Sequence, residues 1–458
     1  MNKENSINPK EHSENFINEF LERIKANLLI DPSLYETYNV KRGLRNKDNT
    51  GVLVGLTVIG EVHGYIFDEN EKVDVHGRLS YRGIDVADIV RACISENRFG
   101  FEEVIYLLLL GELPTKERLD EFSKYLSGFR DLPGNFTEDM ILKAPSRDIM
   151  NKLARSVLAL YSYDDNPDDI SPYNLIRQAI ELIARFPTMI AYAHQAKAHY
   201  YDGKSLFIHS SNPKLSIAEN FLYMMRPDNK FTQEEAHILD LCLILHAEHG
   251  GGNNSAFTTH VVSSSGTDTY SAISAAIGSL KGPKHGGANN RVIGMMDEIK
   301  TNVKNWKDEN EVGAYIAKII NKEAYDRSGL VYGFGHAVYT LSDPRTALLK
   351  ENARGLAEKK GRLDEFELYD LIERLVPKLF AELKHTDRPI PANVDFYSGF
   401  VYSLLDIPPD LYTPLFAMSR VVGWCAHRIE EVLTNTRIIR PAYKSVSKRR
   451  PYTPINER

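Results

Sequence analysis

Residues 245–291 interrupt a chain that otherwise favours helices with two runs of glycine, at 250–252 and 286–287. Each run directly follows a histidine, His249 in the first case and His285 in the second. Glycine is used where the backbone must turn sharply or approach a ligand closely. The pattern therefore predicts helices that end here, with His249 and His285 at the helix ends and facing a cavity.

The residues between the two glycine runs predict a single packed helix over 269–280. Ile273, Ala276, Ile277 and Leu280 recur on one face of it. The two histidines bracket this helix and are able to converge on one site. The alternative is that the glycines only terminate helices that the histidines cap; two such pairs in one stretch favour a site.

Composition limits the classes of protein to consider. The 458 residues are 43% hydrophobic, which is enough for a large core in two or three domains. The net charge of -6 is mixed along the chain, so nothing indicates a nucleic-acid or membrane-surface partner. No signal-peptide core and no membrane-length apolar run is present, and the three cysteines lie among apolar neighbours. A cytoplasmic protein without membrane association is expected.

Apolar spacing predicts a mainly helical fold with one short β-hairpin over 51–81 near the N-terminus. A capping box at 232–235 starts a buried helix that leads to His249. The more charged segment 297–388 indicates a second, smaller domain. Further helices are predicted over residues 15–29, 84–95, 101–110, 116–129, 138–161, 174–201, 311–321 and 363–384, and residues 410–433 are predicted to be buried.

Two further groups of residues, one around His336 and one at Asp395, are candidates for catalysis because of their local sequence. His336 follows a glycine-rich turn, Gly-Phe-Gly-His, and Arg345 comes nine residues later. The turn is not a dinucleotide-binding fingerprint, since Val338 occupies the third glycine position. Asp395 stands at the edge of an apolar run, where loss of solvent raises the basicity of a carboxylate. The alternative role for Asp395 is a helix N-cap.

Arg420 lies within a strongly apolar segment, 415–425. A buried guanidinium is costly unless it meets an anion. Its partner is either a buried carboxylate in a structural ion pair or the carboxylate of a ligand, and the local sequence leaves both open.

The chain resembles the citrate synthase family in seven motifs that stand in that family's order: HAEHGGGNNSAF, GPKHGGAN, GFGHAVY, DPR, NVDFYSG, SRVVGW and RIIRP. The segments GRLSYRGIDV and FEEVIYLLLLGELPT also match, so the resemblance runs from about residue 56 to 440. It implies an all-α fold of two helical domains. A large, dimer-forming domain would comprise residues 1–286 and 394–458, and a small domain, residues 287–393, would cover the active-site cleft.

The resemblance also implies an activity, the condensation of acetyl-CoA with oxaloacetate and water to give citrate and CoA in the tricarboxylic acid cycle. Acetyl-CoA would be a co-substrate, with no tightly bound cofactor and no metal. By this resemblance, His249 would bind oxaloacetate, His285 would hydrogen-bond to the thioester carbonyl and His336 would polarise the ketone. Asp395 would abstract the proton. The substrate carboxylates would be bound by Arg345, Arg420 and Arg440, the last from the second subunit of a homodimer. Animal members carry an arginine shortly after the GHAV histidine, where this chain has Thr340, so the residues that bind the coenzyme phosphates are left unassigned.

These residue types suit that chemistry. Planar guanidinium groups bind carboxylates at two points, and oxaloacetate carries two carboxylates. A thioester methyl group is a very weak acid, so a carboxylate base needs a hydrogen-bond donor on the developing enolate oxygen. His285 is able to supply that donor.

Three alternatives stay open at this stage. The nearest is 2-methylcitrate synthase, which uses propionyl-CoA; one methylene is worth only about 1–3 kcal/mol of discrimination. Another is a metal-dependent hydrolase with ligands from His246, His249, His285 and His336, although no carboxylate or cysteine completes a zinc signature. The third is a non-catalytic helical scaffold, which would leave the glycine-histidine junctions without a purpose.

Overall fold

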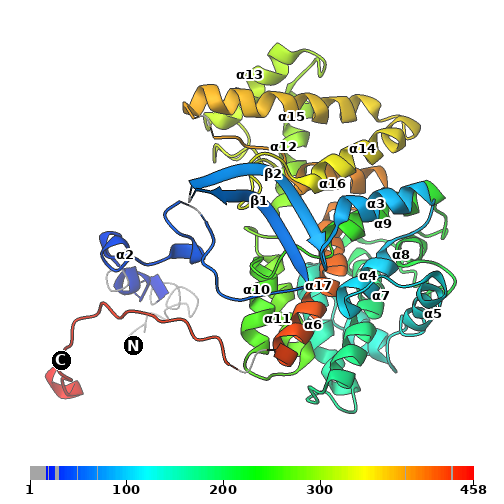
Figure 1. The fold of residues 1–458 in the computed structure, drawn as a ribbon, viewed down its shortest axis with the longest axis horizontal. Helices are drawn as coiled ribbons and strands as arrows, with labels where there is room; N and C mark the ends of the chain where they lie inside the picture. The colour runs from blue at the N-terminus through cyan, green and yellow to red at the C-terminus, as the bar shows by residue number, and fades with distance from the viewer. Residues whose placement is uncertain are drawn as a thin grey trace, which may run out of the picture. The chain divides into compact units, whose positions relative to one another are not determined.

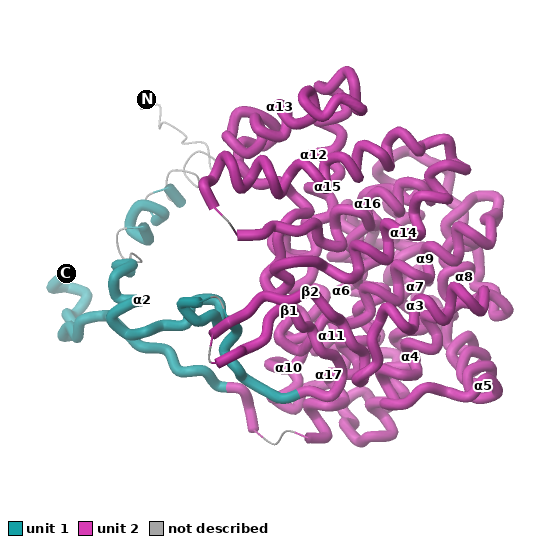
Figure 2. Tube along the Cα trace, turned by 45° about the horizontal axis from the view of Figure 1, so that its top comes forward, with its two compact units in different colours: residues 1–56, 440–458 teal, residues 57–439 magenta. Residues whose placement is uncertain are grey.

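The structure is a computed structural model that describes residues 17–18, 20–25, 30–48, 50–69, 71–386, 388–434 and 437–458. The chain divides into two compact units, residues 57–439 and residues 1–56 with 440–458 (Figure 2). The helix predicted over 15–29 falls partly outside the described residues; 17–18 and 20–25 are helical. The unit of the two chain ends also contains α2 (Ser33–Thr37) and the short 3-10 turns η1 (Arg42–Leu44) and η5 (Ile455–Glu457).

The unit of residues 57–439 is mainly helical, as predicted (Figure 1). Its helices are α3 (Val86–Ser95), α4 (Phe101–Leu110), α5 (Lys116–Ser127), α6 (Ile149–Leu160), α7 (Pro172–Asp202), α8 (Ile217–Met225), α9 (Gln233–His246), α10 (Asn254–Ser263), α11 (Thr269–Lys281), α12 (Ala288–Asn302), α13 (Glu309–Ile320), α14 (Pro344–Lys359), α15 (Leu363–Lys384), α16 (Val394–Leu404) and α17 (Tyr412–Thr434), with short turns η2 (Thr137–Leu142), η3 (Tyr161–Tyr163) and η4 (Pro409–Leu411). Among the described helices, none combines the length and the apolar character that crossing a membrane requires.

The predicted hairpin is present as β1 (Gly60–Asp68) and β2 (Glu71–Tyr81), which pair antiparallel, with β3 (Ile84–Asp85) added beside β2. Two glycines allow the hairpin to lie against the segment 338–342. A Cβ on Gly64 would come within 2.5 Å of the Val338 carbonyl oxygen, and the Gly77 amide donates to Ser342 Oγ at 3.2 Å. The hairpin therefore packs beside the residues that follow His336.

Local signals explain where α9 and α6 begin. Thr232 and Glu235 form the predicted capping box, in which Glu235 N donates to Thr232 Oγ1 at 3.2 Å and Thr232 N donates to Glu235 Oε2 at 2.9 Å. The single helix predicted over 138–161 is wrong, because α6 starts only at Ile149. Asp148 caps α6 by accepting from Asn151 N at 2.7 Å, and the preceding residues form the separate turn η2.

Helix α17 is the central element of the core, packed against α4, α6, α7, α9, α10, α11 and α12. Most of its residues are buried. Gly423 permits the closest approach, because its amide donates to the Ala247 carbonyl at 3.2 Å. A Cβ at Gly423 would lie 2.6 Å from that same carbonyl oxygen. The turn that follows α9 is thus held directly against α17.

Replacing Gly423 and replacing Gly355 with alanine should change stability in opposite directions. Gly423→Ala is expected to cost about 1–3 kcal/mol, because the added methyl meets backbone. Gly355 lies within α14, where a Cβ meets nothing within 4 Å, so Gly355→Ala should stabilise by roughly 0.5–1 kcal/mol. Thermal melts of both variants check this, and an unchanged melting temperature for Gly423→Ala would contradict the packing argument.

Candidate active site

His249 lies in the turn after α9, three residues beyond the end of the helix at His246. Gly250 adopts a φ of 79°, which turns the chain sharply there. The His249 side chain is buried, and its Nε2 has no hydrogen-bond partner among the described residues. Its ring centre lies 5.2 Å from that of His336 and 5.4 Å from that of Tyr339. A buried imidazole nitrogen without a partner indicates a position prepared for a ligand.

His336 is held by pairing between two distant segments. Phe334 and Ala392 form an isolated antiparallel bridge, and the Asn393 amide donates to the Gly333 carbonyl at 2.8 Å. His336 Nδ1 accepts from the amides of Val338 at 3.0 Å and Tyr339 at 3.1 Å. A neutral His336 ring therefore carries its proton on Nε2, which can donate to a ligand.

Asp395 lies in the first turn of α16, directly after this bridge. Asn393 is the N-cap, since its Oδ1 accepts from Asp395 N at 3.1 Å, so the alternative role of Asp395 as the cap is wrong. Burial raises the pKa of Asp395 to about 6, against the opposing charge of Arg345 and with a further contribution from Asp343. Asp395 is a stronger base than an exposed aspartate.

Arg345 is buried and fixed by Asp343. Its Nε donates to Asp343 Oδ1 at 3.0 Å and its Nη2 donates to Oδ2 at 2.7 Å. Asp343 also caps α14 and accepts from Val394 N at 3.1 Å, which ties α14 to the start of α16. Burial opposes ionisation of Asp343, but Arg345 outweighs burial and lowers the pKa of Asp343. This ion pair was not predicted from the sequence, although an aspartate two residues before the arginine was a visible signal.

Arg420 is fully buried on α17, and its Nε donates to the His246 carbonyl at 2.7 Å. Its Nη1 and Nη2 have no hydrogen-bond partner among the described residues. The guanidinium carbon lies 4.7 Å from the centre of the Phe416 ring. Burial lowers the pKa of Arg420 to about 10, while the charge of Glu248 opposes that shift. The structural ion pair considered for Arg420 is therefore absent from the described residues, and two donors are left for a ligand.

His285 lies in the turn after α11, beside Phe416, whose ring centre is 6.2 Å away. Its Nε2 is 3.0 Å from Ser255 Oγ, which also accepts from Trp424 Nε1 at 3.0 Å. Burial, reinforced by Arg420, lowers the pKa of His285 to about 4. Burial also lowers the pKa of His249. Both imidazoles are thus neutral near pH 7.

Six of the seven predicted site residues lie within the unit of residues 57–439 and influence one another through ring contacts or charge: His249, His285, His336, Arg345, Asp395 and Arg420. Arg440 belongs to the unit of the two chain ends. Ser255 and Tyr339 join the site without having been predicted, because a serine or a tyrosine beside a known motif carries no distinctive pattern.

These residues define a class of protein. Neutral buried imidazoles, an unpartnered guanidinium and a carboxylate of raised pKa together suit an enzyme that binds an anion and moves a proton. Residues 48–442 match the family model described as citrate synthase, C-terminal domain.

Curated relatives and solved structures agree with that match. The citrate synthase of Haloferax volcanii is 34% identical over 424 residues, covering 92% of this chain and 99% of the relative. The 2-methylcitrate synthase 1 of Corynebacterium glutamicum is 34% identical over 387 residues, covering 83% and 92%. The Thermoplasma acidophilum citrate synthase, in a ternary complex with carboxymethyl coenzyme A and oxaloacetate, superposes with a TM-score of 0.74 at 28% identity, covering 92% and 99%.

The chain belongs to the citrate synthase family. It is an acyltransferase, and the condensation chemistry of that family is its reaction class. The metal-dependent hydrolase considered above is not supported by these matches. Within the described residues, the side chains close enough to hold a metal ion are His260, His427 and Glu430, which belong to a different cluster from His249 and His285.

Proposed function

We propose that this protein condenses acetyl-CoA with oxaloacetate and water to give citrate and CoA. The observation that carries the proposal is the fully buried Arg420, whose two terminal nitrogens have no partner among the described residues beside a base of raised pKa, Asp395. A buried cation with free donors is stabilised when a carboxylate binds. Oxaloacetate provides two carboxylates and, between them, a ketone to attack.

Oxaloacetate binds first in this scheme, through its carboxylates. Arg420 offers Nη1 and Nη2, and Arg345, held in place by Asp343, offers a second guanidinium. His249 Nε2 contributes a further polar contact. Arg440 from a second copy of the chain is the third arginine that surrounds the two carboxylates of oxaloacetate in this scheme.

Asp395 then removes a proton from the methyl group of acetyl-CoA. With a pKa of about 6, it is mostly ionised near pH 7 and more basic than an exposed aspartate. His285 donates a hydrogen bond to the thioester oxygen as the enolate forms. Trp424 Nε1 can only donate to Ser255 Oγ. Ser255 Oγ has a single proton, and His285 Nε2 and Asn253 Oδ1, at 2.9 Å, compete for it. In this scheme the proton is donated to His285, which places the imidazole proton on Nδ1.

The carbon–carbon bond forms when the enolate carbon attacks the ketone of oxaloacetate. His336, with its Nδ1 occupied by two backbone amides, donates from Nε2 to the ketone oxygen that becomes the hydroxyl of the product. Water then cleaves the thioester of the resulting citryl-CoA, releasing citrate and CoA. No tightly bound cofactor and no metal take part in the proposed reaction.

Release of free thiol tests the proposal directly. The purified protein should release CoA thiol, detected with a chromogenic reagent, only when oxaloacetate and acetyl-CoA are both present. Thiol release without oxaloacetate would contradict it. The second candidate is 2-methylcitrate synthesis, favoured by the 34% identity to a curated 2-methylcitrate synthase. A higher kcat/KM with propionyl-CoA than with acetyl-CoA would select that reaction instead.

We also propose that the protein is a cytoplasmic homodimer. In this scheme a large domain, residues 1–286 and 394–458, makes the dimer, and a small domain, residues 287–393, closes over the cleft. Tyr443 and Tyr452, which follow Arg440 along the chain, are 96% and 81% exposed. Large exposed aromatic side chains on a terminal segment support contact with a second copy of the chain.

Mixing two inactive variants tests the role of Arg440 across the interface. If Arg440 acts in trans, unfolding and refolding Asp395→Asn together with Arg440→Ala should restore about a quarter of wild-type activity, because half the dimers are mixed and each has one intact site. Each variant refolded alone is the control. If Arg440 acts within its own subunit, neither site of a mixed dimer is intact and mixing restores no activity.

A further inference from the structure

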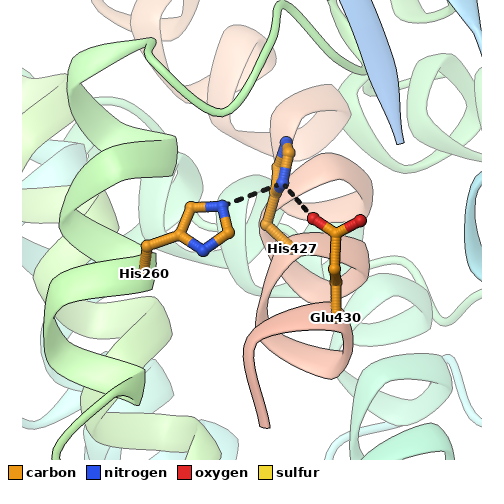
Figure 3. A group of neighbouring side chains, drawn as sticks. All are labelled: His260, His427 and Glu430. Carbon is orange, nitrogen blue, oxygen red and sulfur yellow. Dashed lines mark hydrogen bonds and ion pairs between the residues drawn. The ribbon is translucent and has the colours of Figure 1, made fainter. Parts of the chain in front are cut away.

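Two buried histidines face each other outside the proposed substrate-binding residues. His260 on α10 and His427 on α17 approach with 3.1 Å between His260 Nε2 and His427 Nδ1 (Figure 3). The other nitrogen of each ring meets a carboxylate: His260 Nδ1 is 2.7 Å from Glu431 Oε2, and His427 Nε2 is 3.0 Å from Glu248 Oε1. Glu430 Oε2 lies 3.7 Å from His427 Nδ1.

Counting protons over these contacts assigns a charge to the histidine pair. A carboxylate oxygen accepts hydrogen bonds, so His260 Nδ1 and His427 Nε2 both carry protons. If both rings were neutral, the two nitrogens that face each other would each present a lone pair, and a 3.1 Å approach would be repulsive. One more proton between them turns this contact into a hydrogen bond. The pair then holds three protons and one positive charge.

Glu248 connects the pair to the proposed active site, because it immediately precedes His249. Its Oε1 accepts a hydrogen bond from Gly250 N as well as contacting His427. The Tyr81 hydroxyl, which donates to the Ile244 carbonyl at 2.8 Å, also lies 3.3 Å from the Glu248 carbonyl oxygen. The Glu248 carboxylate thus holds the backbone on the far side of His249, and its charge also acts on Arg420.

Glycines on both sides confine the Glu248 side chain. A Cβ on Gly60 would lie 2.7 Å from Glu248 Cγ, and one on Gly423 would clash with Glu248 Oε2. A Cβ on Gly251 would press on both rings, 3.3 Å from His260 Nε2 and 3.4 Å from His427 Cε1. The carboxylate has little room to move aside, so the hydrogen bond that His427 donates meets it in a fixed place and stabilises its buried charge there.

We infer that His260 and His427 share a proton and that the positive charge of this pair positions Glu248, and with it the Gly250 amide and the backbone of His249, for binding of oxaloacetate. His427 is a positioning residue in this scheme, since it acts through Glu248. The inference rests on the proposed function for its substrate, while the shared proton itself does not depend on any activity.

The inference predicts an effect of high pH. Burial works against the charged form of His427, but Glu248 and Glu430 outweigh it and raise the pKa of His427 to about 9. Burial and the charge of His427 lower the pKa of His260. The other ionisable groups that act on this cluster are Glu431 beside His260, Arg420 and Tyr81 beside Glu248, and Arg82 through Glu430. The shared proton is therefore present below about pH 9 and lost above it.

Nuclear magnetic resonance of protein labelled with ¹⁵N-histidine tests the proton count in the wild-type protein. At pH 7 one ring of the pair should show both nitrogens protonated and the other should show one. Two singly protonated rings would overturn the inference. So would one equivalent of zinc in the purified protein that His260→Gln removes, because a metal ion would then occupy the space between the facing nitrogens.

Kinetics of His427→Gln test the effect on substrate binding. The KM for oxaloacetate should rise about tenfold or more, as expected for loss of a hydrogen bond to a charged group, while kcat at saturation changes less. In the wild-type protein the same KM should rise above pH 9, and in the variant that rise should be absent.

His199→Gln, at an exposed histidine on α7 that bonds to the Lys204 carbonyl, is the matched control and should leave both values unchanged. A variant with lowered thermal stability but wild-type KM and pH profile would overturn the positioning role. If His427→Gln does not fold, the wild-type pH profile and the NMR proton count decide alone.

Discussion

Asp395→Asn is expected to lower kcat about a hundredfold or more, the usual size of a general-base contribution. The amide keeps the shape of the side chain and cannot accept the methyl proton. Folding should be preserved, because Asn393 and not Asp395 caps α16. Oxaloacetate should still bind, since the guanidinium groups of Arg345 and Arg420 are unchanged. Thiol-release kinetics and calorimetric titration with oxaloacetate measure the two effects separately.

The pH dependence of the wild-type enzyme gives an independent check on Asp395. The base must be ionised, and the pKa of Asp395 is raised to about 6, so kcat/KM should fall as the pH drops below about 6. Asp88→Asn is the control, as Asp88 is an exposed aspartate paired with Arg91 on α3. A fully active Asp395→Asn variant would remove this residue from the mechanism.

Arg420→Met is expected to abolish detectable stabilisation by oxaloacetate and to raise its KM at least about a hundredfold, because hydrogen bonds to a charged group contribute about 1.5–3 kcal/mol each. The ligand-free variant should lose far less than the roughly 3–5 kcal/mol that breaking a buried ion pair costs. The reason is that Nη1 and Nη2 have no partner to lose among the described residues. Thermal melts with and without oxaloacetate measure both effects.

Arg428→Met provides a matched control for Arg420, eight residues further along α17. Arg428 is equally buried, but all its nitrogens are used: Nε donates to Thr269 Oγ1 at 2.9 Å, Nη1 to Ser263 Oγ at 3.1 Å and Nη2 to the Thr267 carbonyl. Its replacement should lower stability clearly and leave the KM for oxaloacetate near the wild-type value. The reverse pattern in the two variants would show that Arg420 is structural.

Elements with strong local boundaries could be predicted from the sequence. The bounds of α4 and α15 match the predicted ranges 101–110 and 363–384, since Gly111 ends the first in a left-handed conformation and amphipathic spacing marks the second. The capping box of α9 is equally local. The break before α6 was missed because the apolar pattern continues on both sides of it, although Pro145 and the cap at Asp148 both lie between η2 and the helix.

The residues of the site were predictable individually, but the contacts between them were not. The segments that carry His336 and Asp395 lie side by side because Phe334 pairs with Ala392, a contact between residues far apart in the sequence. His260 meets His427 from helices that are far apart in the sequence, 167 residues from one histidine to the other. Neither contact leaves a periodic or spacing signal, since each depends on how whole helices pack. Arg420 stood out in the sequence because a charge in an apolar helix needs an explanation even before its surroundings are known.

The bridge between Phe334 and Ala392 closes the residues between them into one long insertion in the chain. This insertion leaves the site after His336 and returns just before Asp395. In the turn between α14 and α15, within that insertion, Gly361 has a φ of 68° and open space around it. Insertions or changes of length there are expected to leave the register of both site residues unchanged.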